Sequence, residues 1–105
     1  MTPEGKVRSY LRKQAIAAGF EHRKLGWIGR KNAPDEFIFW PESKTPIAVF
    51  IEVKRENERP TEAQMREIER LRAAGFYVCV VDCKPQVDDL LCWATIAVEA
   101  KGDQE

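Results

Sequence analysis

The chain has 105 residues, of which 44% are hydrophobic and 32% are charged. These proportions indicate one folded domain with its own core, and they exclude an intrinsically disordered chain. Lys and Arg total 17, and Asp and Glu also total 17. Because the net charge is zero, no overall positive field attracts nucleic acid, and any DNA contact must come from a local patch.

Cysteine usage and the N-terminal sequence favour a reducing, intracellular environment. The first residues, MTPEGKVRSY, lack the apolar core of a signal peptide, and no stretch is long enough to cross a membrane. Cys79, Cys83 and Cys92 lie in apolar segments, and the single histidine, His22, is far from them in the sequence. This pattern favours structural thiols over disulfides or a zinc site. We expect a soluble, cytoplasmic protein.

The first predicted element is a helix. Thr2 can cap it, Pro3 can occupy its first position, and Gly19 ends it. The helical spacing places four residues on one apolar face: Val7, Leu11, Ala15 and Ala18.

Three strands are predicted to follow this helix. Residues 20–28 are typical of a weak strand, residues 29–34 of a polar turn, and residues 35–40 (DEFIFW) of a second strand. Residues 47–54 (IAVFIEVK) are rich in Val, Ile and Phe, which indicates a strand buried on both faces. We expect this third strand to be central in the sheet.

A strand-helix-strand unit is predicted next. A helix over residues 61–74 begins with Thr61 and Gln64 at the spacing of a capping box. Its inward residues are predicted to be Ile68 and Leu71. Residues 76–82 (FYVCVVD) then form another buried strand, which should run parallel to the 47–54 strand with a right-handed crossover.

A last helix is predicted from about Pro85. Its apolar face contains Val87, Leu91, Ala94 and Val98. We expect residues 101–105 (KGDQE) to form a polar tail outside the single domain, which spans residues 1–100. The predicted fold is α/β, with a mixed central sheet flanked by helices in the order α-β-β-β-α-β-α.

Charged residues in two of these strands form a candidate active site. The period of two places Glu52 and Lys54 on the same strand face, where burial is costly unless the charges are paired or bind an ion. Asp35 opens the preceding strand, so its carboxylate can meet that of Glu52. Two carboxylates, with the Val53 carbonyl as a further ligand, suit Mg²⁺ or Mn²⁺ in phosphodiester cleavage. The simpler alternative is a structural salt bridge between Glu52 and Lys54.

A known family shares this arrangement. Pro34-Asp35, sixteen residues, and then Glu52-Val53-Lys54 reproduce the PD-(D/E)xK nuclease signature. The segments APDEFIFW, FIEVKRENERPTEAQ and LRAAGFYVCVVD closely resemble the VRR-NUC (virus-type replication and repair nuclease) branch, across nearly residues 1–82. Ala33 departs from the glycine expected just before the Pro-Asp pair.

The resemblance implies a restriction-endonuclease-like PD-(D/E)xK core and a role for each motif residue. Asp35 and Glu52 would bind metal and Lys54 would be catalytic, while Gln64 matches the family's helix glutamine and Glu4 its first-helix acid. The sequence independently places Glu4 and Gln64 on the inward sides of their helices, where both could reach the metal site, Glu4 as a further metal ligand and Gln64 as a catalytic residue. Each also has a purely structural alternative, because Glu4 can complement the helix dipole and Gln64 can close the capping box.

Basic and aromatic residues near the motif have several interpretations. Two basic pairs flank the site and could contact DNA phosphates, or they could be solvated loop residues: Arg30 with Lys31, and Arg55 with Arg59. His22 is more typical of an exposed strand residue than of a general base. Three tryptophans are core or interface residues, or could stack on a base: Trp27, Trp40 and Trp93.

The expected function is metal-dependent, structure-selective cleavage of DNA. The resemblance implies a phage-type homodimer, in a bacterial or phage-infected cell, that acts on branched DNA such as four-way (Holliday) junctions. No organic cofactor is expected. Two alternatives remain open, which are a non-catalytic DNA-binding module with the same fold and a restriction-type endonuclease that reads sequence. The chain has no evident recognition helix or added domain for base readout.

Overall fold

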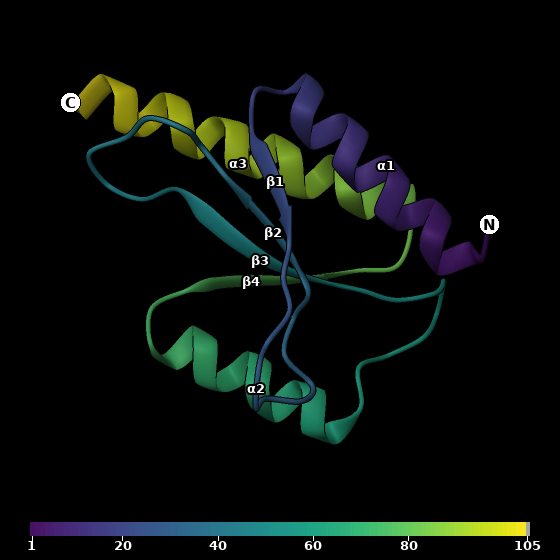
Figure 1. Cartoon of the computed structure of the whole chain (residues 1–105). Helices are drawn as coiled ribbons and strands as arrows, with labels where there is room; N and C mark the ends of the chain where they lie inside the picture. Colours follow the sequence, from purple (N-terminus) through teal and green to yellow (C-terminus); the bar gives the residue numbers. More distant parts are fainter. Residues whose placement is uncertain (105) are drawn as a thin grey trace.

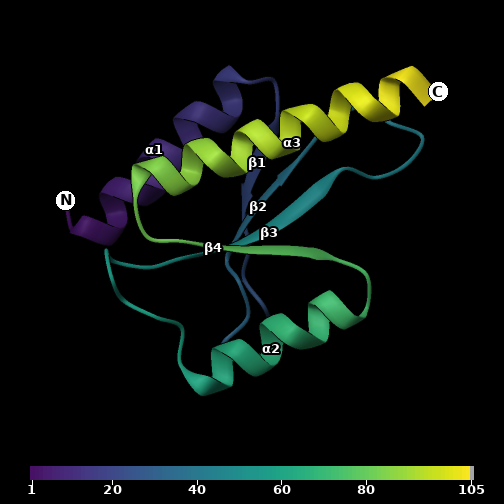
Figure 2. The ribbon, with the colours of Figure 1, turned by 180° about the vertical axis from the view of Figure 1, so that it is seen from behind.

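Four strands form a sheet that is covered by helices on both faces. The structure is a computed structural model that describes the backbone of residues 1–104 and the side chains of residues 1–101. Helices α1 and α3 lie side by side on one face of the sheet, and α2 covers the other face (Figures 1 and 2). The elements are α1 (Pro3–Ala17), β1 (Glu21–Lys24), β2 (Glu36–Phe39), β3 (Ala48–Val53), α2 (Glu62–Ala73), β4 (Tyr77–Val81) and α3 (Lys84–Gln104).

The sheet is mixed, as the sequence predicted. Its order is β1-β2-β3-β4, with antiparallel pairing of β1 with β2 and of β2 with β3, and parallel pairing of β3 with β4. Helix α2 makes the connection that a parallel pair requires. Strand β3 therefore lies inside the sheet, and the predicted order of elements is confirmed. Among the described residues, no helix has the length and apolar character needed to span a membrane.

The main core lies between the sheet and the pair α1 and α3. In β3 every second residue, Val49, Ile51 and Val53, is almost completely buried on this face. The helices contribute their predicted apolar stripes, including Leu11 of α1 and Ala94 of α3, which are both fully buried. Ala18 does not belong to the stripe, because α1 ends at Ala17 and Ala18 is its exposed C-cap residue.

Aromatic rings occupy the opposite face of the sheet. The Phe50 ring centroid lies 4.8 Å from that of Phe37 and 5.8 Å from that of Trp27. Helix α2 begins with the predicted capping box, in which Thr61 and Gln64 exchange hydrogen bonds, and it buries Ile68 completely. Alternation along β3 therefore places Phe50 and Glu52 on the α2 face, away from the main core.

The two edges of the sheet differ in character. Strand β1 has the sequence EHRK and pairs with β2 over only four residues, so the strand predicted over residues 20–28 is shorter than expected. Strand β4 has the sequence YVCVV and was expected to be buried along its length. Because β4 lies at the sheet edge, Tyr77 is 53% exposed, with its ring against that of Trp93.

Helix α3 is longer than the sequence indicated. Its backbone remains helical through Gln104, where residues 101–104 were expected to form a polar tail. The last residue of that expected tail, Glu105, lies outside the described residues. All three cysteines are free thiols, as predicted.

Candidate active site

The Pro34-Asp35 segment is held at the start of β2 by two hydrogen bonds to its backbone. The Leu25 amide donates to the Asp35 carbonyl at 2.8 Å, and the Trp27 indole nitrogen donates to the Pro34 carbonyl at 2.6 Å. Pro34 is fully buried. The indole of Trp27, whose role the sequence left undecided, therefore fixes the position from which the Asp35 carboxylate projects.

An arginine on α1 links three carboxylates around this point. Arg8 donates to Asp35 Oδ1 at 2.9 Å and to Glu36 Oε1 at 3.0 Å, and its other terminal nitrogen lies 3.7 Å from Glu4 Oε1. Burial disfavours the charge on Arg8, but the hydrogen bonds and the field of these carboxylates raise its pKa above the ordinary value. Glu4 therefore reaches the site through Arg8.

Histidine 22 differs from the expectation of an exposed strand residue. Its side chain is 10% exposed, and its Nε2 lies 3.0 Å from Oε2 of Glu36. Glu36 is itself 4% exposed, on the same face as the fully buried Ile38. His22 is therefore half of a buried polar pair that anchors the Glu36 carboxylate beside Arg8.

Glu52 and Lys54 lie together at the carboxyl end of β3. Lys54 Nζ is 3.7 Å from Glu52 Oε1, and the two side chains are 11% and 8% exposed, respectively. The Lys54 amide donates to the Val81 carbonyl at 2.9 Å, which extends the β3–β4 ladder and fixes the lysine backbone. Burial raises the pKa of the Glu52 carboxyl; the Lys54 ammonium opposes this rise, and the nearby negative charge of Asp35 adds to it.

Gln64 contacts this pair from α2. Its Nε2 donates to Glu52 Oε1 at 3.4 Å, while its Oε1 accepts the Thr61 amide at 2.9 Å. The capping role and the site role that the sequence allowed for Gln64 therefore coexist, because the two ends of the amide serve different partners.

The two predicted basic pairs do not converge on the motif. Arg30 is directed to Glu67 on α2, at 2.6 and 2.8 Å, and Arg55 pairs with Glu58 at 3.2 Å. Lys31 and Arg59 are exposed. Arg30 and Lys31 border one hollow on the surface, and Arg55 borders another.

Sequence reasoning missed Arg8 and Glu36. Arg8 follows Glu4 by four residues and precedes Leu11 by three, so helical spacing already placed it at the inward edge of α1. Glu36 alternates with Ile38, which indicated a buried carboxylate in β2. Neither pattern, however, reveals which partner neutralises the charge.

The donor set suits a hard divalent cation. Asp35 and Glu52 interact electrostatically, and burial of Glu52 leaves its negative charge poorly solvated, which a cation would relieve. The Val53 carbonyl is the backbone oxygen between Glu52 and Lys54 in the chain. Within residues 1–101, no three acidic, His or Cys side chains form a ready metal cage. In this structure the Asp35 carboxylate accepts a hydrogen bond from Arg8.

Comparison with known proteins identifies the class to which this fold and site belong. The VRR-NUC domain matches residues 6–85. A solved structure of a VRR-NUC domain superposes with a TM-score of 0.79 and 40% sequence identity, covering 87% of this chain and 96% of that one. The chain therefore belongs to the VRR-NUC domain family, a family of nucleases.

A phage protein provides a second relative. "Putative nuclease p44" of Acyrthosiphon pisum secondary endosymbiont phage 1 is 39% identical over 69 residues, which cover 59% of this chain and 71% of that protein. The predicted family and the predicted fold are both confirmed.

Proposed function

We propose that the protein is a divalent-metal-dependent DNA endonuclease with Asp35, Glu52 and Lys54 as its catalytic centre. The observation that carries the proposal is the nearly buried pair of Glu52 and Lys54 in the field of the Asp35 carboxylate. Burying an ammonium and a carboxylate, with a second carboxylate nearby, is costly for a purely structural role. The cost is understandable where the groups must act on a charged substrate.

The metal would be Mg²⁺ or Mn²⁺, held by Asp35, Glu52 and the Val53 carbonyl. Bound there, it would activate water and stabilise charge on the scissile phosphate. Lys54 orients the attacking water or neutralises the phosphate oxygens, because its ammonium is held within 3.7 Å of Glu52 on a fixed strand end. Gln64 steadies the Glu52 carboxylate by donating from α2.

Arg8 holds the acidic cluster together when no metal is bound. Its two hydrogen bonds place one positive charge between the carboxylates of Asp35 and Glu36. Arg8 occupies Oδ1 of Asp35, so a metal that binds this carboxylate would compete with Arg8 for its negative charge. Glu4 and Glu36 remain as alternative partners for the guanidinium.

The proposed substrate is branched DNA, and the proposed assembly is a homodimer. A domain of this size has little surface with which to hold a junction, so a second copy supplies the second active site. Exposed apolar residues of β4 and α3 support an association surface on that side: Tyr77, Trp93 and Ile96. Light scattering at micromolar concentration tests the dimer, and a monomer in the presence of a four-way junction would contradict it.

The catalytic proposal is tested by incubating the protein with linear, flapped and four-way DNA in Mg²⁺, Mn²⁺ or EDTA. We expect cleavage of the branched DNA with either metal and none in EDTA. Asp35→Asn and Glu52→Gln should abolish cleavage, whereas Asp89→Asn, at an exposed position of α3, serves as a matched control.

Other outcomes identify the alternatives. DNA binding without cleavage under every metal condition would favour a non-catalytic module. Efficient cutting of linear duplex at one fixed sequence would favour a restriction-type enzyme.

A further inference from the structure

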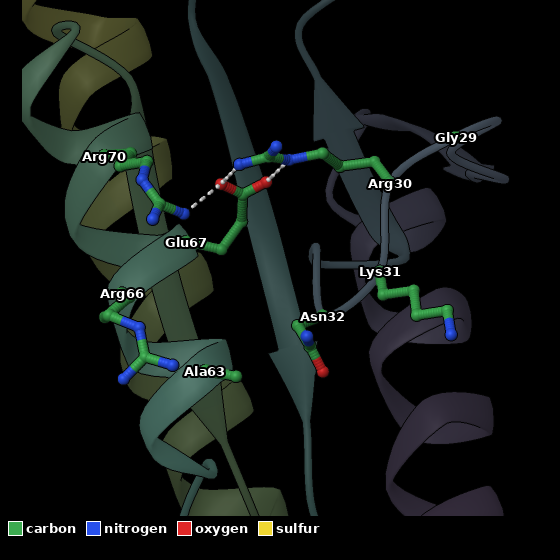
Figure 3. A pocket seen from close by; sticks show the side chains of 8 residues that line it. All are labelled: Gly29, Arg30, Lys31, Asn32, Ala63, Arg66, Glu67 and Arg70. Atoms are coloured by element: carbon green, nitrogen blue, oxygen red, sulfur yellow. Dashed lines mark hydrogen bonds and ion pairs between the residues drawn. The ribbon is translucent and has the colours of Figure 1, made fainter.

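A basic hollow lies between the 29–32 turn and helix α2, outside the metal-ligand cluster. It has a volume of about 290 Å³, and four of its eight lining residues are cationic. Figure 3 shows the turn on one side and α2 on the other, with Arg30 reaching across the gap between them. The lining residues are Gly29, Arg30, Lys31, Asn32, Ala63, Arg66, Glu67 and Arg70.

One carboxylate organises the cations of this hollow. Glu67 is 8% exposed and accepts from Arg30 at 2.6 and 2.8 Å and from Arg70 at 3.3 Å. These hydrogen bonds lower the pKa of Glu67 to about 2, and the one from Arg30 has the largest effect. The Glu67 carboxyl therefore stays ionised at neutral pH. The arginines therefore keep fixed positions, and their combined charge exceeds that of the single acid.

Arg66 supplies a charge that the hollow does not neutralise. It is exposed, and among the described side chains it has no ion pair. Arg66 and Arg70 are four residues apart and lie along the same side of α2 (Figure 3). Lys31 extends away from α2 and adds positive charge at the rim (Figure 3). Because the whole chain has zero net charge, this local excess of positive charge indicates a specific role.

We propose that this hollow binds the backbone phosphates of DNA next to the cleaved bond, with Arg66, Arg70 and Arg30 as the phosphate-contacting residues. The inference rests on the proposed DNA substrate and adds a second binding site to it. Planar guanidinium groups suit phosphate oxygens, and those of Arg30 and Arg70, which Glu67 holds, lose less entropy on binding.

The position of the hollow relative to the candidate active site supports the proposal. Ala63 borders the hollow, and the next residue, Gln64, contacts Glu52. Arg70 is six residues beyond Gln64, about 9 Å along the helix axis at a rise of 1.5 Å per residue. Phosphates of one strand of a duplex advance by about 3.4 Å per nucleotide along the axis. The hollow therefore begins beside the residue that contacts Glu52 and extends along α2 over a length that matches about three nucleotides of one strand.

The turn side of the hollow is also connected to the active site. The segment that contains Arg30 continues directly to Pro34 and Asp35, whose backbone is fixed by Trp27 and Leu25. Both walls of the hollow thus continue along the chain into residues of the candidate catalytic centre, so the hollow lies beside that centre.

The test measures binding of a fluorescently labelled four-way junction in EDTA over a range of salt concentrations. Each lost phosphate contact reduces the slope of log K against log salt by about 0.9 and weakens binding roughly eightfold at 0.1 M salt. We expect this change for Arg66→Gln. Lys13→Gln removes the same charge from the exposed side of α1 and should leave the slope unchanged.

The outcomes separate this inference from the catalytic proposal, because binding in EDTA needs no cleavage. An Arg66→Gln slope equal to that of the wild type, with equal affinity, would overturn the inference even if the enzyme cuts DNA. A reduced slope for Arg66→Gln in a protein that cuts no DNA would support phosphate binding at the hollow and refute the catalytic proposal. Equal melting temperatures of Arg66→Gln and the wild type exclude a folding defect.

Discussion

The side-chain amide of Gln64 donates to Glu52 Oε1 at 3.4 Å while its oxygen accepts the first amide of the α2 cap. A residue that begins a helix thus also contacts a proposed metal ligand. Substitutions that keep one of these interactions and remove the other can separate them.

Gln64→Glu should retain the capping box, because a glutamate side chain can also accept the Thr61 amide. It replaces a donor to Glu52 with a second carboxylate, so cleavage should fall although the capping hydrogen bond to the Thr61 amide is kept. Thr61→Ala should do the opposite, losing about 1 kcal/mol of stability with near-normal cleavage. Melting curves and cleavage rates measured on both variants check this prediction. Normal cleavage by Gln64→Glu would show that its contact with Glu52 is not functional.

Lys54→Met should lower turnover by roughly 100- to 1000-fold, the range for removing one group that stabilises transition-state charge. Methionine keeps most of the buried side-chain volume, so the protein should fold. DNA affinity should change little, because the proposed role is in the transition state. Single-turnover cleavage and binding in EDTA measure the two effects separately, with Lys13→Met as the control. Wild-type turnover in Lys54→Met would remove the lysine from the mechanism.

Arg8→Gln should destabilise the metal-free protein by roughly 1–3 kcal/mol, because it removes charged hydrogen bonds to Asp35 and to the buried Glu36. The same change frees Asp35 for a cation. Mn²⁺ should therefore raise the melting temperature of Arg8→Gln more than that of the wild type. Arg12→Gln, at an exposed position of the same helix, controls for loss of charge. An equal Mn²⁺ effect in all three proteins would contradict competition between Arg8 and metal.

Glu67 should contribute to acid stability. Its pKa in the folded protein is lowered from 4.5 to about 2, first by the hydrogen bond from Arg30. A carboxyl whose pKa is depressed by folding stabilises the folded state above its unfolded pKa, and this contribution is lost as the pH falls toward the folded pKa. Wild type should therefore melt above Glu67→Gln at pH 6, and the difference should shrink between pH 4.5 and pH 2. Glu69→Gln, on the exposed side of α2, is the control; a difference that does not vary with pH would refute this role.

The elements and the motif could be predicted from local patterns, but the neutralising contacts could not. Thr2, Thr61 and the alternation in β3 depend on residues near in the sequence, so the helices, the caps and the side on which Glu52 lies were predictable. The contact of Arg8 with Asp35 spans 27 residues, and that of Arg30 with Glu67 spans 37. These pairs form only after the sheet brings distant segments together. The exposure of Tyr77 was missed for a similar reason, because strand composition does not indicate which strand forms the edge.

The unequal sheet edges limit how copies of this protein can associate. A sheet in which both edge strands can pair with strands of other molecules can assemble indefinitely, as in a fibre. Here the β1 edge carries Glu21, Arg23 and Lys24, which resist desolvation against another strand, and β4 has no charged residue. Strand-to-strand growth can therefore start at only one edge. Once two β4 edges have met, the outer edges of the pair are both β1, and growth terminates.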